Sequence, residues 1–366
     1  MAEFADLALF RQVPVVPVSK VHQHVALGGP IWPGFATRTV VRHCRNNHPW
    51  DHEPALPDAM TALDQPAVWG GFLDSHFGHF VADHLPRLPV SLLKRPEDLY
   101  LFTVDPGMTR DGLAGWVWQV FDWIGLARDQ VRIVTEPLLV AELRVGRQAE
   151  MLPQVGPRAG YLDLIDRWFY QLDPVRVPVL YVARAGMAAR GGGAHAGEDY
   201  LVTLLRRLGV AVLDPAMATV PEQLASYAGA RHLIFAEGSA LHGRQLIGRV
   251  AQDISVIRRR DDTRMAEAML APRCRKLSYL DVGSDRLMTY WKTGAKRPDP
   301  ALCLYDVARL QDAFRGWGLD LAAAWDAAAF RRAEAADVAA WLAFWQPDAA
   351  RMAEYHSVLA RAGASL

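Results

Sequence analysis

The chain has 366 residues, of which 51% are hydrophobic and 22% charged, a composition typical of a globular protein with a sizeable core. Lys+Arg and Asp+Glu both number 40, so the formal net charge is zero, which argues against a nucleic-acid-binding protein and against a polybasic membrane anchor. The three cysteines, Cys44, Cys274 and Cys303, are too few and too far apart for a disulfide framework, and we expect reduced thiols.

The N-terminus carries Glu3 and Asp6 and no basic region, so we expect no secretory signal. No stretch approaches the ~20 apolar residues that a membrane-spanning helix needs. The sequence therefore predicts a cytoplasmic protein without an integral membrane segment. Peripheral association with a membrane stays compatible with this prediction, and the sequence does not indicate an oligomeric state.

The predicted elements change in character along the chain. Residues 1–66 are rich in Pro and His, and we expect them to be irregular. From Val68 to Val145, apolar strand patterns alternate with helical patterns, which predicts an α/β unit. We interpret the amphipathic segment 161–172, which an Asp-Pro pair follows, as the crossover to a second domain.

Residues 173–285 show the clearest alternation of strands and helices. We expect strands at 177–183, 210–213, 233–236 and 254–257, and helices at 198–208, 221–228 and 239–247. This order predicts a parallel sheet with helices on both faces, whose ligands bind at the carboxyl ends of the strands. The predicted domains are therefore 1–172 and 173–285, followed by an Ala-rich helical tail over 286–366.

The first segment that can carry chemistry is Gly71–Leu88. On a regular helix, four of its polar side chains share one face: His76, His79, Asp83 and Arg87. Pro86 makes Arg87 the least secure member. A carboxylate one turn from a histidine can hold its proton or raise its basicity, as the base of an inverting sugar transfer requires. A structural Asp–His pair and a metal site formed by the same residues are the alternatives.

Two further segments follow strands of the second domain. Arg184 stands at the carboxyl end of a strand and Arg190 in the Gly-rich loop after it, and arginine forks suit a diphosphate. Glu237 precedes a Gly238–Ala240 turn in which Ser239 is expected to cap a helix, so that the N–H groups of the turn can hold a pyrophosphate. Glu237 can accept hydrogen bonds from ribose hydroxyls. Surface arginines and an ordinary strand–turn–helix connection are the alternatives.

Histidines and a cysteine also cluster near the N-terminus. The members are His43, Cys44, His48 and His52. Their spacing matches no strong metal-ligand pattern, so we predict no metal site.

Four segments, in this order, resemble glycosyltransferase family 61. They read GHFVADHLPRL (Gly78–Leu88), LYVARAGMAAR (Leu180–Arg190) with Gly197-Glu198, PEQLASYAGA (Pro221–Ala230) and FAEGSALHG (Phe235–Gly243). The resemblance covers about Val68 to Ile257. The chain departs from the family pattern at Asp83, where Glu is usual, and at Gly197, where Asn is usual, so that only Glu198 of that pair matches.

The resemblance implies an α/β fold of the GT-B type, with two Rossmann-like domains facing a cleft, and an inverting, metal-independent transferase of polysaccharide or capsule assembly. It implies that the second domain binds a UDP- or GDP-linked sugar, with no further cofactor. The donor-binding residues it suggests are Arg184, Arg190, Glu198, Glu237, Gly238, Ser239, Ala240 and His242.

By the same resemblance, the N-terminal domain offers a glycan acceptor and the base, which is Asp83 or His79 supported by Asp83, with His76 beside them. We expect the tail to pack back on the N-terminal domain, as last helices often do in such transferases. An inactive nucleotide-sugar-binding module and a nucleotide-sugar epimerase of similar architecture are the alternatives to a transferase.

Overall fold

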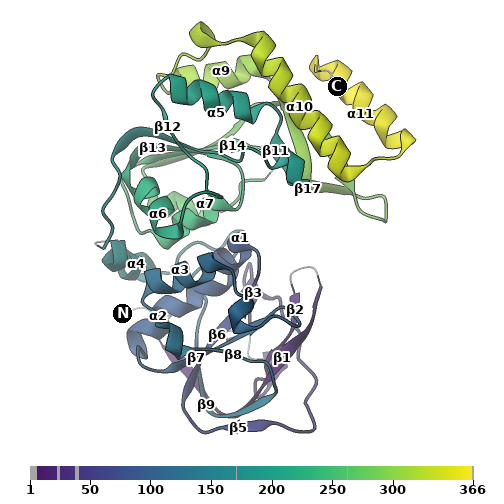
Figure 1. Cartoon of the computed structure of the whole chain (residues 1–366). Coiled ribbons are helices and arrows are strands. Elements are labelled where there is room, and N and C mark those ends of the chain that lie inside the picture. Colours follow the sequence, from purple (N-terminus) through teal and green to yellow (C-terminus); the bar gives the residue numbers. More distant parts are fainter. Residues whose placement is uncertain (1–5, 23–24, 38–40, 170, 262, 365–366) are drawn as a thin grey trace.

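The computed structural model describes residues 6–22, 25–37, 41–169, 171–261 and 263–364. The chain forms two lobes that lie one above the other in Figure 1. The N-terminal lobe contains the elements up to residue 169, and the C-terminal lobe contains those from residue 177 onward. Both lobes combine a sheet with helices, which confirms the predicted α/β class.

The N-terminal lobe is built on a seven-stranded sheet with the order β2-β1-β9-β6-β7-β8, in which β5 pairs with β9. Its strands are β1 (Leu7–His22), β2 (Val25–Pro30), β5 (Thr61–Leu63), β6 (Ala67–Leu73), β7 (Leu99–Val104), β8 (Val131–Ile133) and β9 (Leu138–Gly146). β9, β6, β7 and β8 run parallel, whereas β1 is antiparallel to β2 and β9. The other elements include the hairpin strands β3 (Cys44–Arg45) and β4 (His48–Pro49) and the helices α2 (Leu88–Lys94), α3 (Gly115–Ile124) and α4 (Tyr161–Phe169).

The first strand departs most from the expected irregular N-terminus. β1 pairs with β9 up to Val15 and with β2 from Val15 onward. Pro14 and Pro17 obscure this strand in the sequence, because proline cannot donate to a strand ladder and normally argues against a strand. Here Pro17 lies where the pairing with β2 shifts its register. The prediction that residues 1–66 are irregular is therefore wrong for β1 and β2.

The C-terminal lobe is built on a five-stranded sheet with the order β12-β10-β13-β14-β15. Its strands are β10 (Val177–Val182), β12 (Ala211–Leu213), β13 (Ala230–Ala236), β14 (Asp253–Arg258) and β15 (Lys276–Asp281). Every neighbouring pair is parallel, which confirms the predicted parallel sheet. The helices on the side of the N-terminal lobe are α6 (Val220–Gly229), α7 (Ala240–Gly243) and α8 (Glu267–Leu270), and those on the other side are α5 (Glu198–Arg207) and α9 (Val307–Gly316) (Figure 1).

Buried polar contacts join the two lobes. Glu150, which follows β9, forms an ion pair of 2.8 Å with Arg273, and both side chains are buried. The indole Nε1 of Trp123 on α3 donates a hydrogen bond of 3.0 Å to the carbonyl of Leu246. One apolar core also runs through both lobes at this boundary and includes Phe80 and Tyr227. The lobes therefore share a continuous interior.

The segment after the sheet contains strands as well as the expected helices. β16 (Gly283–Tyr290) and β17 (Lys296–Tyr305) form a small sheet with β11 (Ala194–His195), and α10 (Ala327–Trp345) and α11 (Ala349–Ala362) pack on it. This segment lies on the C-terminal lobe (Figure 1) and does not return to the N-terminal lobe, contrary to our expectation. The ring of Trp341 accounts for the difference, because it is buried between β17 and α11 while its Nε1 donates to the carbonyl of Pro300 at 2.8 Å.

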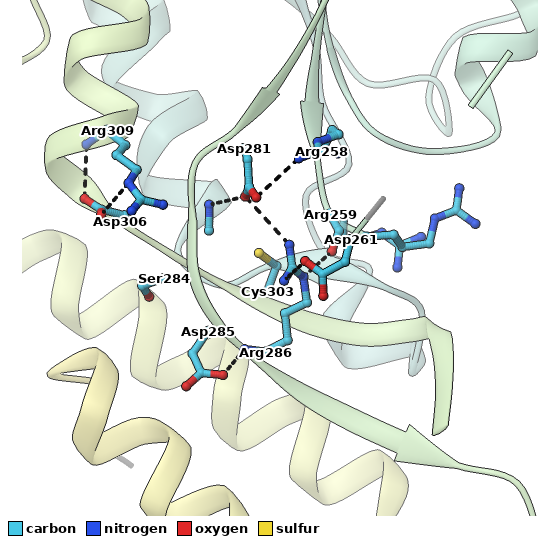
Figure 2. A network of polar contacts seen from close by, with 12 residues as sticks. Arg258, Arg259, Asp261, Asp281, Ser284, Asp285, Arg286, Cys303, Asp306 and Arg309 are labelled. Carbon is cyan, nitrogen blue, oxygen red and sulfur yellow. Dashed lines mark hydrogen bonds and ion pairs between the residues drawn. The ribbon is translucent and has the colours of Figure 1, made fainter. Parts of the chain in front are cut away.

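A polar network fastens the small sheet to the end of β14 (Figure 2). Arg286 of β16 lies between Asp261 and Asp281, at ion-pair distances of 2.5 and 3.7 Å, and its Nε donates to the carbonyl of Arg259 at 2.7 Å. Arg258 contacts Asp281 at 3.3 Å. The network thereby holds the chain after β14 beside β15 and β16.

Candidate functional site

A cavity of about 680 Å³ lies between the lobes, at the carboxyl ends of β10 and β13. This volume falls within the range of roughly 300–1,000 Å³ that is usual for ligand sites. The N-terminal lobe contributes Ser75, His76, Phe77, Trp116 and Gln119 to its wall. The C-terminal lobe contributes Ala183, Arg184, Met187, residues 215–220, Gln223, Ala236, Gly238, Ser239 and Ala240. The cavity is therefore at the sheet edge that the alternation of strands and helices predicted.

Arg184 supplies a cation to the wall of this cavity. Its backbone N–H donates to Glu198 Oε1 at 2.9 Å, and its Nε donates to the carbonyl of Gly193 at 2.6 Å. A Cβ atom at Gly238 would collide with the guanidinium, so glycine there lets the arginine lie against the turn after β13. Burial lowers the pKa of Arg184, and the nearby Glu198 carboxylate opposes that shift.

The turn after β13 differs in part from its prediction. α7 spans only Ala240–Gly243 and continues as a 3-10 turn, η7 (Arg244–Leu246). Ser239 is at the N-cap position, but its side chain makes no capping hydrogen bond. The N–H groups of Leu241 and His242 bond to carbonyls within the turn. Within the described residues, the N–H groups of Gly238, Ser239 and Ala240 make no hydrogen bond to the protein and can serve an anion.

The first predicted segment meets this turn across the lobe boundary. It folds as α1 (Phe77–His79), a π-helical turn η2 (Phe80–His84) and a 3-10 turn η3 (Leu85–Arg87). A Cβ atom at Gly78 would lie 3.1 Å from the Cβ of Ser239 and 3.0 Å from the ring of His242, so α1 approaches α7 closely. Figure 1 shows α1 at the boundary between the lobes, near α7. The structure thus brings the two predicted segments together.

Asp83 lies behind α1 as a fully buried carboxylate. Arg45 Nη2 is 2.5 Å from its Oδ2, and His79 Nδ1 is 3.4 Å from the same oxygen. Burial alone would raise the pKa of Asp83, but the contacts with His79 and Arg45 outweigh it and hold this pKa below its ordinary value. Asp83 is therefore an anion at neutral pH. It does not line the cavity, whereas His76 on the same segment does.

His79 pairs with Asp83 and, like Asp83, is not part of the cavity wall. Its Nδ1 also lies 3.1 Å from Arg45 Nη2, so its donor or acceptor role depends on the tautomer. The rings of His79 and His76 have centroids 4.7 Å apart, and His76 Nδ1 accepts a hydrogen bond of 3.4 Å from the His79 N–H. When Nδ1–H donates to Asp83, Nε2 is the nitrogen that can accept a proton.

Arg45 is the functional candidate that sequence reasoning missed. It ends β3, and Asn46 and Asn47 then turn the chain into β4 with φ of 53° and 64°. Such an Asn-Asn pair with two positive φ angles is a strong hairpin signal. The signal was present in the sequence and predicts the turn, although it does not show that the hairpin delivers an arginine to Asp83.

Two predicted carboxylates are buried beside the cavity and do not line it. Glu198 Oε1 accepts hydrogen bonds from Tyr181 Oη at 2.7 Å and from the Arg184 N–H, while Oε2 has no partner. Burial raises the pKa of Glu198 to about 7. Glu237 accepts from the N–H groups of Arg259 and Arg260 and pairs with the Arg260 guanidinium at 2.8 Å. Both therefore hold backbone in place, and the expected bond from Glu237 to a ribose is not prepared.

The remaining predicted residues lie in contrasting places. Arg190 is an exposed residue at the end of the 3-10 turn η6 (Ala188–Arg190) and is absent from the cavity wall. His242 is buried, binds Gln245 Oε1 at 2.7 Å through Nδ1, and has its pKa lowered to about 4 by burial. His242 is therefore neutral at pH 7 and supports α1 through its contact with Gly78.

Arg87 does not share the face of His76, His79 and Asp83, as a regular helix predicts. The π-helical turn over Phe80–His84 adds more residues per turn, so every later side chain is rotated away from the predicted stripe. Arg87 is buried and donates instead to the carbonyl of Val41 at 3.4 Å. The stripe prediction is therefore confirmed up to Asp83 and wrong beyond it.

The described residues contain no group of three or more His, Cys, Asp or Glu side chains arranged to hold a metal ion. None of their helices is both long and apolar enough to cross a bilayer.

Comparison with known families places this geometry in an enzyme class. Residues 77–244 match the family described as Glycosyltransferase 61, so the domain that builds the cavity is that of a glycosyltransferase. This match confirms the resemblance of the four segments to glycosyltransferase family 61. The match includes His79, Asp83, Arg184 and Ser239, whereas Arg45 lies outside it. No curated protein matches the chain.

Proposed function

We propose that the protein is an inverting, metal-independent glycosyltransferase of the GT-B type, which moves a sugar from a nucleotide-sugar to a hydroxyl of a glycan. One observation carries the proposal. Arg184 and the free N–H groups of Gly238–Ala240 form one wall of an interlobe cavity, and His76 lines the opposite wall with His79 and Asp83 behind it.

In this proposal the C-terminal lobe holds the diphosphate of a UDP- or GDP-linked sugar. The Arg184 guanidinium and the N–H groups of the 238–240 turn bind the phosphate oxygens. As the bond between the anomeric carbon and the diphosphate breaks, its electron pair passes to a phosphate oxygen. Preorganised donors stabilise this growing charge, which is the task that a divalent metal performs in other transferases. Metal independence rests on this distribution of donors and is open to direct test.

The N-terminal lobe supplies the acceptor and its base. The acceptor hydroxyl attacks the anomeric carbon from the face opposite the leaving group and loses its proton to His79 Nε2. Asp83 accepts the Nδ1–H of His79, fixes that tautomer and stabilises the imidazolium that forms. Arg45 keeps Asp83 ionised. Because Asp83 itself is fully buried, we assign it to positioning His79 and assign proton transfer to His79.

The cavity wall beyond Arg184 has space for the remainder of a nucleotide. Residues 215–220 follow β12, and Trp116 and Gln119 reach the cavity from α3. Gln119 Oε1 accepts the Val220 N–H at 2.8 Å, which ties this loop to the N-terminal lobe. Together these residues offer an apolar face and backbone polar groups for the nucleobase. A place in cytoplasmic polysaccharide assembly is part of the same proposal.

The test measures nucleotide release and product formation with purified protein and a panel of UDP-, GDP-, CMP- and TDP-sugars in EDTA. Arg184→Ala should lower turnover about 100-fold or more, by analogy with the loss of one donor to a developing anion. Arg206→Ala, an exposed arginine on α5, should leave turnover unchanged. Activity that disappears in EDTA and returns with Mg²⁺ or Mn²⁺ contradicts metal independence.

The same experiment separates the other functions. Nucleotide-sugar binding without product favours an inactive binding module, and formation of the epimeric nucleotide-sugar favours an epimerase. Retention of the donor's anomeric configuration in the product contradicts the inverting mechanism.

A further inference from the structure

Arg87 is a buried cation without an anionic partner. Within the described part of the chain, its guanidinium donates to the carbonyls of Val41 and Arg42, at 3.4 and 3.5 Å, and its Nε has no hydrogen-bond partner. Among the described residues, no carboxylate forms an ion pair with it. Burial lowers the pKa of Arg87 to about 10, so it stays charged at neutral pH. An uncompensated buried charge is costly, which points to an anion that binds there.

The surroundings of Arg87 form a small polar cavity. The rings of His43 and His84 stack with centroids 4.4 Å apart, and both ring nitrogens of His43 are buried without a partner. Together with Arg87 and Thr103 they line a space of about 40 Å³. Burial lowers the pKa of both histidines well below its ordinary value, so both are neutral. Arg87 therefore supplies the uncompensated positive charge of a space large enough for one small group.

The carboxylate nearest to this cavity is already engaged. Asp51 pairs with Arg42 Nε at 2.7 Å and accepts the His43 N–H at 3.3 Å. Asp51 and Arg42 thus offset each other. The positive charge of Arg87 is left for a ligand.

A surface groove adjoins this cavity. Trp50, Asp51 and His52 line both the cavity and an adjoining groove of about 470 Å³, to which Lys20 and Leu27 also contribute. The Trp50 indole is 40% exposed, and Lys20 and His52 are exposed. A flat indole packs well against the C–H face of a sugar ring, and a lysine at the mouth attracts an anion.

We propose that this groove binds an acidic sugar of the acceptor, with the sugar ring on Trp50 and its carboxylate in the cavity against Arg87. An arginine fork matches a carboxylate by two parallel hydrogen bonds. The inference rests on the proposed function and names its acceptor class as a glycan containing uronic acid or another sugar carboxylate.

The groove is connected to the candidate base. The Arg45 guanidinium, which pairs with Asp83, lies 5.4 Å from the ring centroid of Trp50. His84, which lines the cavity, follows Asp83 directly on the π-helical turn. The β3–β4 hairpin therefore positions the groove and the carboxylate behind His79 at the same time.

The test measures binding of D-glucuronate and D-galacturonate to the full chain by saturation-transfer NMR and calorimetry, each beside its methyl ester. The acids should bind at least tenfold more tightly than the esters, because only the acids carry the charge. Trp50→Ala and Lys20→Ala, both at exposed positions, should weaken acid binding about tenfold and about threefold. Arg87→Gln should abolish the preference for acid over ester.

Matched controls lie in the other lobe. Trp291→Ala and Lys292→Ala remove an exposed indole and an exposed lysine, and should leave acid binding unchanged. A nucleotide-sugar should raise the melting temperature of every variant, which shows that each is folded and that the donor site is intact.

Equal binding of acids and esters, or no binding of either while the nucleotide-sugar still binds, overturns this inference and leaves the proposed function standing. If chloride stabilises the protein in a way that depends on Arg87, and neither acid binds, the inference is also overturned, because the cavity then holds an inorganic ion. Failure of donor binding and turnover in the wild-type protein instead counts against the proposed function.

Discussion

Two arginine–carboxylate pairs have nearly the same chemistry and different surroundings: Glu150–Arg273 joins the two lobes, and Asp83–Arg45 lies within the N-terminal lobe. Glu150 and Arg273 form a closed network, in which Glu150 also accepts from Gln245 at 3.0 Å and Arg273 also donates to the carbonyl of Met269 at 2.6 Å. Asp83 and Arg45 form an open one, whose third member, His79, is partly exposed. We therefore expect the closed pair to act in stability and propose that the open pair acts in proton transfer through its histidine.

The largest effect that separates the two pairs is expected at His79. His79→Ala removes the proposed proton acceptor and should lower kcat about 100- to 10,000-fold, the usual contribution of a general base. The measurement is steady-state nucleotide release with the best donor and acceptor. His356→Ala, an exposed histidine on α11, serves as the control and should have no effect. If both His79→Ala and Asp83→Asn retain full turnover, the base assignment is wrong.

The closed pair should instead respond in stability. Glu150→Ala leaves Arg273 buried without its anion and should lower the free energy of unfolding by about 3–5 kcal/mol, measured by urea denaturation. The exposed pair of Asp163 with Arg249 gives the comparison, and Asp163→Ala should cost far less. The folded fraction of the Glu150→Ala protein should have the same kcat as the wild type. A large loss of kcat at unchanged stability would show that the closed pair acts in the reaction.

A third buried carboxylate sharpens the comparison because its hydrogen-bond donors, the Tyr181 hydroxyl and the Arg184 backbone N–H, are neutral. Burial raises the pKa of Glu198 from 4.5 to about 7, so the folded state holds its proton more tightly than the unfolded state does. Its contribution therefore opposes folding increasingly as the pH rises from about 4.5 to above 7. Over 2.5 pKa units this amounts to at most about 3 kcal/mol.

Glu198→Gln should remove that pH dependence and make the protein more stable than the wild type at pH 8. The measurement is the free energy of unfolding of both proteins at pH 5 and pH 8. Parallel pH dependence in the two proteins would mean that Glu198 titrates normally in the folded state.

The smallest expected effect tests the contact between the lobes at α1. Gly78→Ala places a methyl group 3.0–3.1 Å from His242 and Ser239, so α1 should shift by a few tenths of an ångström. Because the proposed mechanism requires His79 and the 238–240 turn to be aligned, kcat should fall severalfold, roughly up to tenfold, with little change in melting temperature. Gly115→Ala, at the start of α3 with open space around its Cβ position, is the matched control. Unchanged kcat in Gly78→Ala would show that this alignment tolerates the shift.

Much of the C-terminal lobe was predictable because its strands are apolar runs separated by helical patterns. Arg184 and Ser239 were found for the same reason, since residues that follow neighbouring parallel strands meet at one edge. Prolines within β1 hid that strand, because the sequence does not show which residues of a ladder need no N–H. We did not predict the strands β16 and β17, because the alanine content of the tail led us to expect helices there.

The rest of the site depends on tertiary contacts that no local pattern encodes. Trp116 and Gln119 lie on an ordinary amphipathic helix and reach the cavity only because α3 packs against α6. Arg45 comes from a hairpin more than thirty residues before Asp83. The π-helical turn after His79 changes the helical phase, so a constant angle of 100° per residue places Arg87 on the wrong side.

The closed Glu150–Arg273 pair also restricts how substrates enter. A hinge motion that opens the lobes would separate two buried charges and break the hydrogen bond from Trp123 to the carbonyl of Leu246. A wide opening is therefore costly at this boundary. Exchange of donor and product is then expected through the rim of the cavity, where Met217 is 84% exposed. Turnover in such an enzyme would be governed by short loop movements around a stationary pair of lobes.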